Sequence, residues 1–348
     1  MPGGMEKHVY NLTSTQRLSG FDVSIAFSEG KKTHCDDILL PTKFNLRKIK
    51  SAALRSFIFY CYLVMYLLLN RPKFDAVHIH GDWCDAMFCP LIKWLVGANV
   101  TVFSFHGFIG NRLSQKKVLP KLIKYFDATY CTGYDSYKFL LEKDPAKVHF
   151  IHSGISQKFL ETVSLIPLHD RHYDVVSVAN FVGVKNHLFM LRLAILMPQF
   201  SFCFIGDGVL LDKSKEFARL EGMSNVTFLG GVSPKEVVLA LDDSKVFLLA
   251  SLEEGTPTSV IEAMSRGLPV VAAKVGGVEH IVKDGENGIV FDGYVINDFV
   301  KGLTMFLENK ELYVKVKKIN RFYAEAHSWH CVGSAISKLF IFDNKGCK

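Results

Sequence analysis

Short apolar runs alternate with segments of helical spacing over most of the second half of the chain. The runs expected to form strands are residues 174–179, 200–205, 226–229, 245–250, 269–273 and 288–291. Between them, apolar residues recur three or four positions apart, as at Leu188 and Leu191 or at Val237 and Leu241. Strands that alternate with helices of this length are typical of a parallel, doubly wound sheet. The second half therefore predicts an α/β fold.

The first half follows the same pattern less regularly, with expected strands at residues 23–27, 76–80, 100–105, 128–132 and 148–151. With 348 residues, 49% of them hydrophobic, the chain is large enough to bury two cores. It thus predicts two Rossmann-like domains in tandem, joined near residues 161–172, where Pro167 and a polar run interrupt the pattern. A helix is expected to begin by Met5 or Glu6, so the first strand of the N-terminal domain is either missing or encoded upstream of Met1.

Two carboxylates, Glu254 and Glu262, bracket a turn that follows one of the expected strands. Pro257 favours a tight loop between them, and Thr258 or Ser259 is expected to cap the helix that follows. The first-turn N–H groups of such a helix suit an anion, and ligands of open parallel sheets bind at the carboxyl ends of the strands. This turn is therefore the leading candidate for a binding site.

Lys185 lies in the loop after the first expected strand of the second domain, which places it at the same sheet edge as Glu254. A lysine in that position can neutralise a diphosphate as a point charge. The alternative is a solvated surface lysine that binds no ligand.

Taken in order, these residues resemble the retaining nucleotide-sugar glycosyltransferases of glycosyltransferase family 4, which have the two-domain GT-B fold. The resemblance runs over nearly the whole chain, in residues 3–8, 75–81, 105–107, 148–159, 180–185, 205–208, 228–230 and, most specifically, 254–269. It implies an N-terminal acceptor-side domain over residues 1–165 and a C-terminal nucleotide-sugar-binding domain over residues 166–325. A C-terminal helix over residues 326–348 would cross back to the first domain.

By this resemblance, Glu254 would hold hydroxyls of the transferred sugar as a catalytic residue, and Lys185 would neutralise the diphosphate. Glu262 would accept hydrogen bonds from the ribose hydroxyls, a task that suits an ionised carboxylate. The further catalytic and donor-binding residues would be His106 beside the sugar, Gly3 and Gly4 at the diphosphate, and Asn180, Thr256, Thr258 and Ser259. The simpler alternatives are a surface charge for Glu262, a carboxylate near the positive helix end for Glu254, and a structural role for His106.

Two residues depart from the family pattern. Pro257 stands where many relatives have glycine, and it has no backbone N–H to offer a ligand. Asn180 stands where relatives often have arginine, so it offers a hydrogen bond without a charge. Fixed groups aimed at developing charge contribute roughly a hundredfold to a thousandfold per donor. Either Lys185 would therefore carry more of the stabilisation of the leaving nucleoside diphosphate, or another basic residue would substitute for the missing arginine.

A metal site formed by His78, His80, Asp82 and Asp85 is the competing interpretation of the first domain. On a strand, His78 and His80 point to the same face, an arrangement that would allow both to bind one metal ion. The resemblance is to a metal-independent class of enzymes, however. We therefore expect neither a metal nor another cofactor, and we expect the two histidines to be structural or to line a pocket.

Positive charge is concentrated in the first half, with 21 Lys and Arg against 13 Asp and Glu in residues 1–165. One basic cluster, Lys43, Arg47, Lys48, Lys50 and Arg55, precedes an apolar run at residues 57–69. A second, Arg112, Lys116, Lys117, Lys121 and Lys124, is interleaved with apolar residues. Basic amphipathic helices bind anionic membrane surfaces, gaining roughly 1 kcal/mol per cation.

The alternative is that residues 57–69 form a core helix and that the lysines are solvated. The run holds 13 apolar residues, short of the roughly 18 to 20 needed to cross a bilayer, so it is not expected to span. Nucleic-acid binding is not expected, because no recognised nucleic-acid module is present.

The sequence as a whole predicts a glycosyltransferase that moves a sugar, with retention, from a nucleotide-sugar donor to a lipid-linked or growing glycan acceptor in cell-surface polysaccharide biosynthesis. Eight cysteines without a CxxC pair and a polar N-terminus favour a cytoplasmic protein. The two basic clusters favour a peripheral position on the inner face of the cytoplasmic membrane. Two alternatives stay open. One is a sugar-nucleotide epimerase of the same architecture, and the other is a non-catalytic or degenerate sugar-nucleotide-binding protein.

Overall fold

The structure is a computed structural model that describes residues 4–28, 34–40, 46, 49, 51–106, 109, 113–161 and 166–341. The chain divides into two compact units, the first made of Met1–Ser153 with Trp329–Lys348 and the second of Gly154–Ser328. The main sheet of the first unit has four parallel strands and that of the second has six. The prediction of an α/β chain with two Rossmann-like domains is therefore confirmed.

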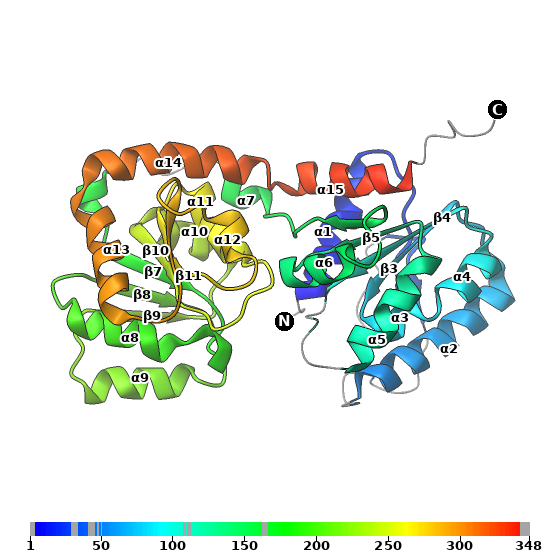
Figure 1. The fold of residues 1–348 in the computed structure, drawn as a ribbon, viewed down its shortest axis with the longest axis horizontal. Helices are drawn as coiled ribbons and strands as arrows, with labels where there is room; N and C mark the ends of the chain where they lie inside the picture. Colours follow the sequence, from blue (N-terminus) through cyan, green and yellow to red (C-terminus); the bar gives the residue numbers. More distant parts are fainter. Residues whose placement is uncertain are drawn as a thin grey trace. The chain divides into compact units, whose positions relative to one another are not determined.

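The six strands of the second unit are those that the sequence predicted. They are β7 (Tyr173–Val178), β8 (Phe202–Ile205), β9 (Val226–Gly230), β10 (Ser244–Leu249), β11 (Val270–Ala273) and β12 (Gly288–Phe291). Neighbouring strands are parallel, and the order across the sheet is β12-β11-β10-β7-β8-β9 (Figure 1). The first strand of the unit lies in the middle and the chain winds outward from it in both directions, which is the doubly wound arrangement.

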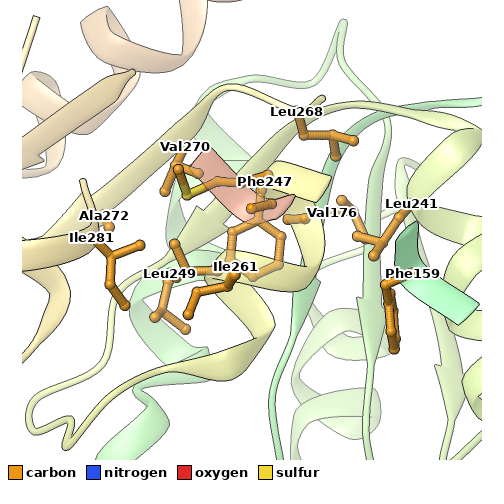
Figure 2. Close-up of a cluster of buried hydrophobic side chains, with 14 of the residues drawn as sticks. Phe159, Val176, Leu241, Phe247, Leu249, Ile261, Leu268, Val270, Ala272 and Ile281 are labelled. Atoms are coloured by element: carbon orange, nitrogen blue, oxygen red, sulfur yellow. The ribbon is translucent and has the colours of Figure 1, made fainter. Parts of the chain in front are cut away.

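Helices cover both faces of this sheet. On one face lie α8 (His187–Leu196), α9 (Leu211–Leu220) and α13 (Ile296–Glu308), and on the other lie α7 (Gln157–Leu160), α10 (Pro234–Asp242), α11 (Thr258–Ser265) and α12 (Val278–Ile281), with α14 (Lys310–Glu325) against α11. Alternate residues of one strand enter opposite cores. Phe247 and Leu249 of β10 join the cluster that Figure 2 shows, whereas Val246 and Leu248 join the cluster on the other face. Burial on both faces explains why these strands are continuous apolar runs.

The first unit contains a four-stranded parallel sheet in the order β3-β4-β5-β6 and a separate parallel pair, β1-β2. Its strands are β1 (Ala26–Phe27), β2 (Ile38–Leu39), β3 (Ala76–Gly81), β4 (Val100–Phe105), β5 (Ala128–Cys131) and β6 (Val148–Phe150). Its helices up to β6 are α1 (Gly4–Leu18), α2 (Ala52–Asn70), α3 (Trp83–Ala86), α4 (Cys89–Val96), α5 (Leu113–Leu122) and α6 (Tyr134–Leu141). In the described part of the chain α1 precedes every strand, as the sequence predicted. The two-residue strand β2 was missed because it is too short to show a period.

The last described helix also belongs to the first unit. This helix, α15 (Trp329–Ser337), packs along α1, and a short 3-10 turn, η5 (Lys338–Phe340), follows it. Trp329 and Val332 share a buried cluster with Leu12 of α1 and Tyr130 of β5. The chain thus returns to the first unit after it has built the second.

The apolar run at residues 57–69 lies on α2, which buries only one of its sides. Tyr60, Leu63 and Leu67 are buried in a cluster with residues of α4 and β2. By length and hydropathy alone residues 53–70 could cross a bilayer, so the expectation that the segment is too short is corrected, because the helix begins ahead of the apolar run. Only 17% of this stretch is buried in the protein. The alternative that the run is simply a core helix is therefore wrong.

Candidate functional site

In the middle of the six-stranded sheet the order of the strands reverses, because β8 and β9 follow β7 on one side and β10, β11 and β12 lie on the other. β7 and β10 are hydrogen-bonded neighbours, with Val175 opposite Val246. The connection after β7 leads to α8 on one face of the sheet, and the connection after β10 leads to α11 on the other. Connections that separate in this way form the ligand-binding crevice of open α/β sheets.

Lys185 and Glu254 meet at this point. The Lys185 ammonium group (Nζ) donates to Glu254 Oε1 at 2.6 Å, and the Ser251 hydroxyl donates to the same oxygen at 2.6 Å. The Glu254 side chain is 6% exposed and the Lys185 side chain 23%. A carboxylate buried to this extent needs strong donors, and the ammonium and the hydroxyl supply them. The prediction that the two side chains share one sheet edge is confirmed, while their catalytic roles stay predictions.

The backbone around Glu254 is held by two further connections of the sheet. Gly276, which follows β11, has a φ of +52°, and a Cβ added there would overlap the carbonyl oxygen of Glu254. Tyr294 lies in the connection after β12, and its hydroxyl donates to the backbone carbonyl of Ser251 at 2.7 Å. Sequence reasoning missed Ser251, Gly276 and Tyr294. The one usable signal was a serine three positions before Glu254, at the end of a strand.

Two buried aromatic residues, Phe181 before Lys185 and His187 after it, contact each other. The His187 ring stacks on Phe181, with ring centroids 3.8 Å apart. Burial, together with the charge of Lys185, lowers the pKa of His187 to about 4, so the ring is neutral at pH 7. The Leu252 N–H donates to the Val184 carbonyl at 2.7 Å, which ties the loop that carries Lys185 to the loop that carries Glu254.

The helix after Glu254 is not capped in the way that the sequence predicted. α11 begins at Thr258, its N-cap residue is Pro257, and no side chain caps it. The prediction of Thr258 or Ser259 as the cap is wrong, because both are already helical and the proline in the cap position has no side-chain oxygen. Thr256, Thr258 and Ser259 are each partly exposed. A helix N-terminus without a side-chain cap retains N–H donors and partial positive charge that suit an anion.

Asn180 lies in the connection after β7, as Lys185 does, and Glu262 lies in the helix that follows β10 and Glu254. Glu262 lies in the second turn of α11 and is half-buried. Asn180 is exposed two residues after β7, and its backbone carbonyl accepts a hydrogen bond from the Val182 N–H at 2.8 Å. Their assigned contacts with a donor stay predictions.

His106, the catalytic candidate of the first unit, lies in a cluster of histidines. It follows β4, and its Nε2 is 3.2 Å from Nδ1 of His80 on β3. Its ring centroid is 4.6 Å from that of His8 on α1. Burial lowers the pKa of His106 to about 4, and burial together with the neighbouring histidines lowers that of His8 to about 2. Both rings are therefore neutral at pH 7.

The two glycines predicted at the diphosphate belong to the start of the first unit. Gly4 is the first residue of α1. Gly3 lies outside the described residues. The predicted site residues that the structure describes thus fall into two sets, Gly4 and His106 in the first unit and the rest in the second.

The metal site predicted as an alternative is wrong in its composition. Asp82 and Asp85 form a capping box at the start of α3, in which the Asp85 carboxylate accepts from the Asp82 N–H at 2.8 Å. His78 and His80 do share a face, with ring centroids 3.9 Å apart. Because the two carboxylates serve the helix, they are not ligands beside these histidines.

A different set of histidines in the first unit, the buried His8 and the partly buried His80 and His106, has ring nitrogens within 4.8 Å of one another. Hydrogen bonds already engage these rings. His8 is bonded through Nδ1 to the Ser153 hydroxyl at 2.8 Å and through Nε2 to the Tyr130 hydroxyl at 3.1 Å. A network of neutral, hydrogen-bonded imidazoles accounts for the cluster without an ion.

Comparisons with known proteins support this architecture. The model of "Glycosyltransferase Family 4" matches residues 2–159, and that of "Glycosyl transferases group 1" matches residues 166–322. Sucrose-phosphate synthase from Thermosynechococcus elongatus is similar in fold, with a TM-score of 0.78 and 16% identity over 97% of this chain and 93% of that one. HepE of Anabaena, solved with UDP and glucose, has a TM-score of 0.75 and 14% identity over 97% and 96%. The UDP-Gal:alpha-D-GlcNAc-diphosphoundecaprenol alpha-1,3-galactosyltransferase of Escherichia coli is 24% identical over 277 residues, which are 73% of this chain and 71% of that protein.

Two parallel Rossmann-like sheets of this kind define the GT-B fold. The two family models follow one another along nearly the whole chain, and the chain belongs to glycosyltransferase family 4. It is therefore an enzyme of the retaining hexosyltransferase type, as the sequence predicted.

Proposed function

We propose that this enzyme moves a sugar from a nucleotide-sugar donor to a lipid-linked or growing glycan acceptor in cell-surface polysaccharide biosynthesis. The observation that supports the proposal best is the contact between Lys185 and the buried Glu254, in the connections that follow β7 and β10 of the six-stranded sheet. HepE of Anabaena was solved with UDP and glucose, and the relative from Escherichia coli is named for a UDP-Gal donor and a diphosphoundecaprenol-linked acceptor. In this chain the second unit would bind the donor and the first unit the acceptor.

In this proposal Glu254 binds hydroxyls of the transferred sugar and Lys185 neutralises the diphosphate. The ammonium group is already fixed by its ion pair in a partly buried position. Fixed charge of this kind stabilises the negative charge that develops on a leaving nucleoside diphosphate without reorganisation at the moment of reaction. Ser251 keeps a hydrogen bond to the carboxylate and so acts as a positioning residue.

The remaining predicted residues complete the proposal. Glu262 accepts hydrogen bonds from the ribose hydroxyls, and neutral His106 donates or accepts a hydrogen bond beside the sugar. Donors to sugar or phosphate oxygens come from Asn180 and from the backbone of Gly3, Gly4, Thr256, Thr258 and Ser259.

We further propose that the protein works in the cytoplasm, at the inner face of the cytoplasmic membrane, where a lipid-linked acceptor would be presented. Helix α5 supports this proposal, because its basic side chains are exposed and an apolar one is buried. Lys116, Lys117 and Lys121 are exposed, whereas Leu119 is buried. The described part of the second predicted basic cluster is therefore amphipathic. Most of the first cluster, together with Arg112, lies outside the described residues.

The test is a screen of nucleotide sugars against a lipid extract, with mass detection of the product and assignment of its anomeric configuration. Transfer with retention is expected, and Lys185→Ala and Glu254→Gln are each expected to abolish most of it while the fold persists. Lys213→Ala and Glu253→Gln change exposed residues of the same unit and serve as matched controls.

Three results would overturn the proposal. Hydrolysis or epimerisation of the donor without any acceptor would indicate an epimerase. Donor binding in calorimetry without transfer to any extracted lipid would indicate a non-catalytic binding protein. Turnover like that of the wild type in Lys185→Ala or Glu254→Gln would remove the assigned roles.

A further inference from the structure

The outward side of α2 is apolar along its whole length. Leu54, Phe57, Cys61, Met65 and Leu68 are all exposed, and at 100° per residue they fall within an arc of about 80°. A surface helix normally turns charged and polar side chains to water. No charged residue interrupts this stripe, which we call the α2 apolar face.

The opposite side of α2 holds the helix on its unit. The Tyr60 ring stacks on Phe88, with centroids 4.4 Å apart, and Leu63 and Leu67 are buried in the same cluster. Helix α4 lies beside α2 (Figure 1), and its Trp94 is 75% exposed. A helix held in this way can lie along an apolar surface but cannot cross it without leaving its own core.

The sequence around α2 is positively charged and contains no acidic residue. From residue 38 to residue 74 there are seven basic residues and no Asp or Glu. They are Lys43, Arg47, Lys48, Lys50 and Arg55 on the N-terminal side, and Arg71 and Lys73 on the C-terminal side. The structure describes three of them, Arg55 in the first turns of α2 and Arg71 and Lys73 just after its end. Positive charge at both ends of an apolar helix face is complementary to anionic lipid headgroups above an apolar interior. The same charge would repel a second copy of this surface.

We propose that the α2 apolar face inserts into the boundary between headgroups and acyl chains of an anionic membrane, with α2 parallel to the surface. The proposal deepens the membrane contact described under the proposed function, and it does not depend on the reaction that the enzyme catalyses. Burial of apolar side chains is not screened by salt, whereas attraction between surface charges is. Binding should therefore persist at salt concentrations that release a purely basic surface.

The test is flotation of the full chain with vesicles of phosphatidylcholine and phosphatidylglycerol, at low and high salt. The wild-type chain is expected to float and to stay bound at high salt. Met65 is 59% exposed, so Met65→Lys removes little buried contact while it adds a cation to the centre of the face. We expect it to lower the partition coefficient about tenfold, because lysine is unfavourable in an apolar layer.

Two control variants isolate the face. Met65→Leu keeps an apolar side chain of similar size and should bind within about twofold of the wild type. Phe322→Lys makes the same kind of change at an aromatic residue that is 80% exposed on α14, in the second unit. It should also leave binding within about twofold, because Phe322 is not part of the α2 apolar face. Circular dichroism and thermal unfolding of each variant separate loss of binding from loss of fold.

Four results would overturn the proposal. They are a wild-type chain that does not float, complete release at high salt, binding of Met65→Lys equal to that of the wild type, and a dimer in sedimentation that Met65→Lys dissociates. The last result would assign the face to a second copy of the chain. None of these measurements requires sugar transfer, so they fail or succeed separately from the proposed reaction.

Discussion

The ion pair between Lys185 and Glu254 permits a double-mutant test of what the lysine does. Lys185→Ala leaves a carboxylate whose side chain is 6% exposed, with the Ser251 hydroxyl still donating to it. Removing one partner of a fully buried pair costs about 3–5 kcal/mol. The Lys185 side chain is 23% exposed, so partial solvation reduces the expected loss in the free energy of unfolding to about 2–3 kcal/mol. For a unit of this size the loss corresponds to a fall in Tm of about 4–12 °C.

Adding Glu254→Gln to Lys185→Ala is expected to restore part of this stability. The amide is neutral, so no buried charge remains without its counter-ion, and Ser251 can still donate to the amide oxygen. We expect a favourable coupling of at least about 1 kcal/mol between the two substitutions. Transfer is not expected to return, because the diphosphate would still lack its cation, and kcat should stay about a hundredfold to a thousandfold below that of the wild type.

Thermal unfolding of the wild type, both single variants and the double variant measures the coupling, and turnover of a donor measures the catalytic effect. Lys213→Ala, a change at an exposed lysine of α9, is the control for loss of positive charge in the same unit. The reasoning is refuted if Lys185→Ala leaves the Tm unchanged. It is also refuted if the double variant recovers both stability and transfer.

The remaining predictions concern the groups around the two candidate sites. Burial lowers the pKa of His8 to about 2, of His78 to about 3 and of His106 to about 4, so the unfolded chain binds more protons below its histidine pKa of about 6.5. Stability of the first unit should therefore fall as pH decreases from that value, by about 1.4 kcal/mol per pH unit for each histidine, and a Tm that does not change between neutral and mildly acidic pH would contradict this. Gly276→Ala should destabilise the second unit by about 2–4 kcal/mol and weaken donor binding in calorimetry. The control, Gly293→Ala, changes a glycine with a φ of +83° and open space around it, so it should cost only about 1–2 kcal/mol. Equal losses of stability in the two variants would show that the contact with Glu254 is unimportant. Ser251→Ala should cost about 1–3 kcal/mol and lower kcat with little change in KM, and an unchanged kcat would show that Ser251 does not position the carboxylate.

The strands of the second unit could be predicted because burial on both faces makes each one a continuous apolar run. β10, for example, sends Phe247 and Leu249 to one core and Val246 and Leu248 to the other. In the first unit, β1 and β2 have two residues each, too few for alternation to be visible. The length of an element therefore decided how well it could be recognised.

The contact between Lys185 and Glu254 could be predicted because the loops after parallel strands share one edge of the sheet. Gly276 and Tyr294 could not be predicted, because each reaches the Glu254 loop from another connection, at a distance set by the packed fold. Asp82 and Asp85 entered the competing metal interpretation because a capping box and a pair of metal ligands look alike in a sequence.

The exposed face of α2 could not be predicted either, because an apolar helix in a core and one at a membrane have the same composition. Only the placement of Tyr60, Leu63 and Leu67 on the buried side shows which residues are left outside. The burial of one side and the exposure of the other are properties of the fold, which the hydropathy of the segment does not contain.

The most direct test of the central claim is a crystal structure of the full chain with a non-hydrolysable nucleotide-sugar analogue. The account predicts that the diphosphate lies beside the Lys185 ammonium group and that sugar hydroxyls contact the Glu254 carboxylate, at the carboxyl ends of β7 and β10. An analogue bound elsewhere, with the ion pair between Lys185 and Glu254 untouched, would contradict it.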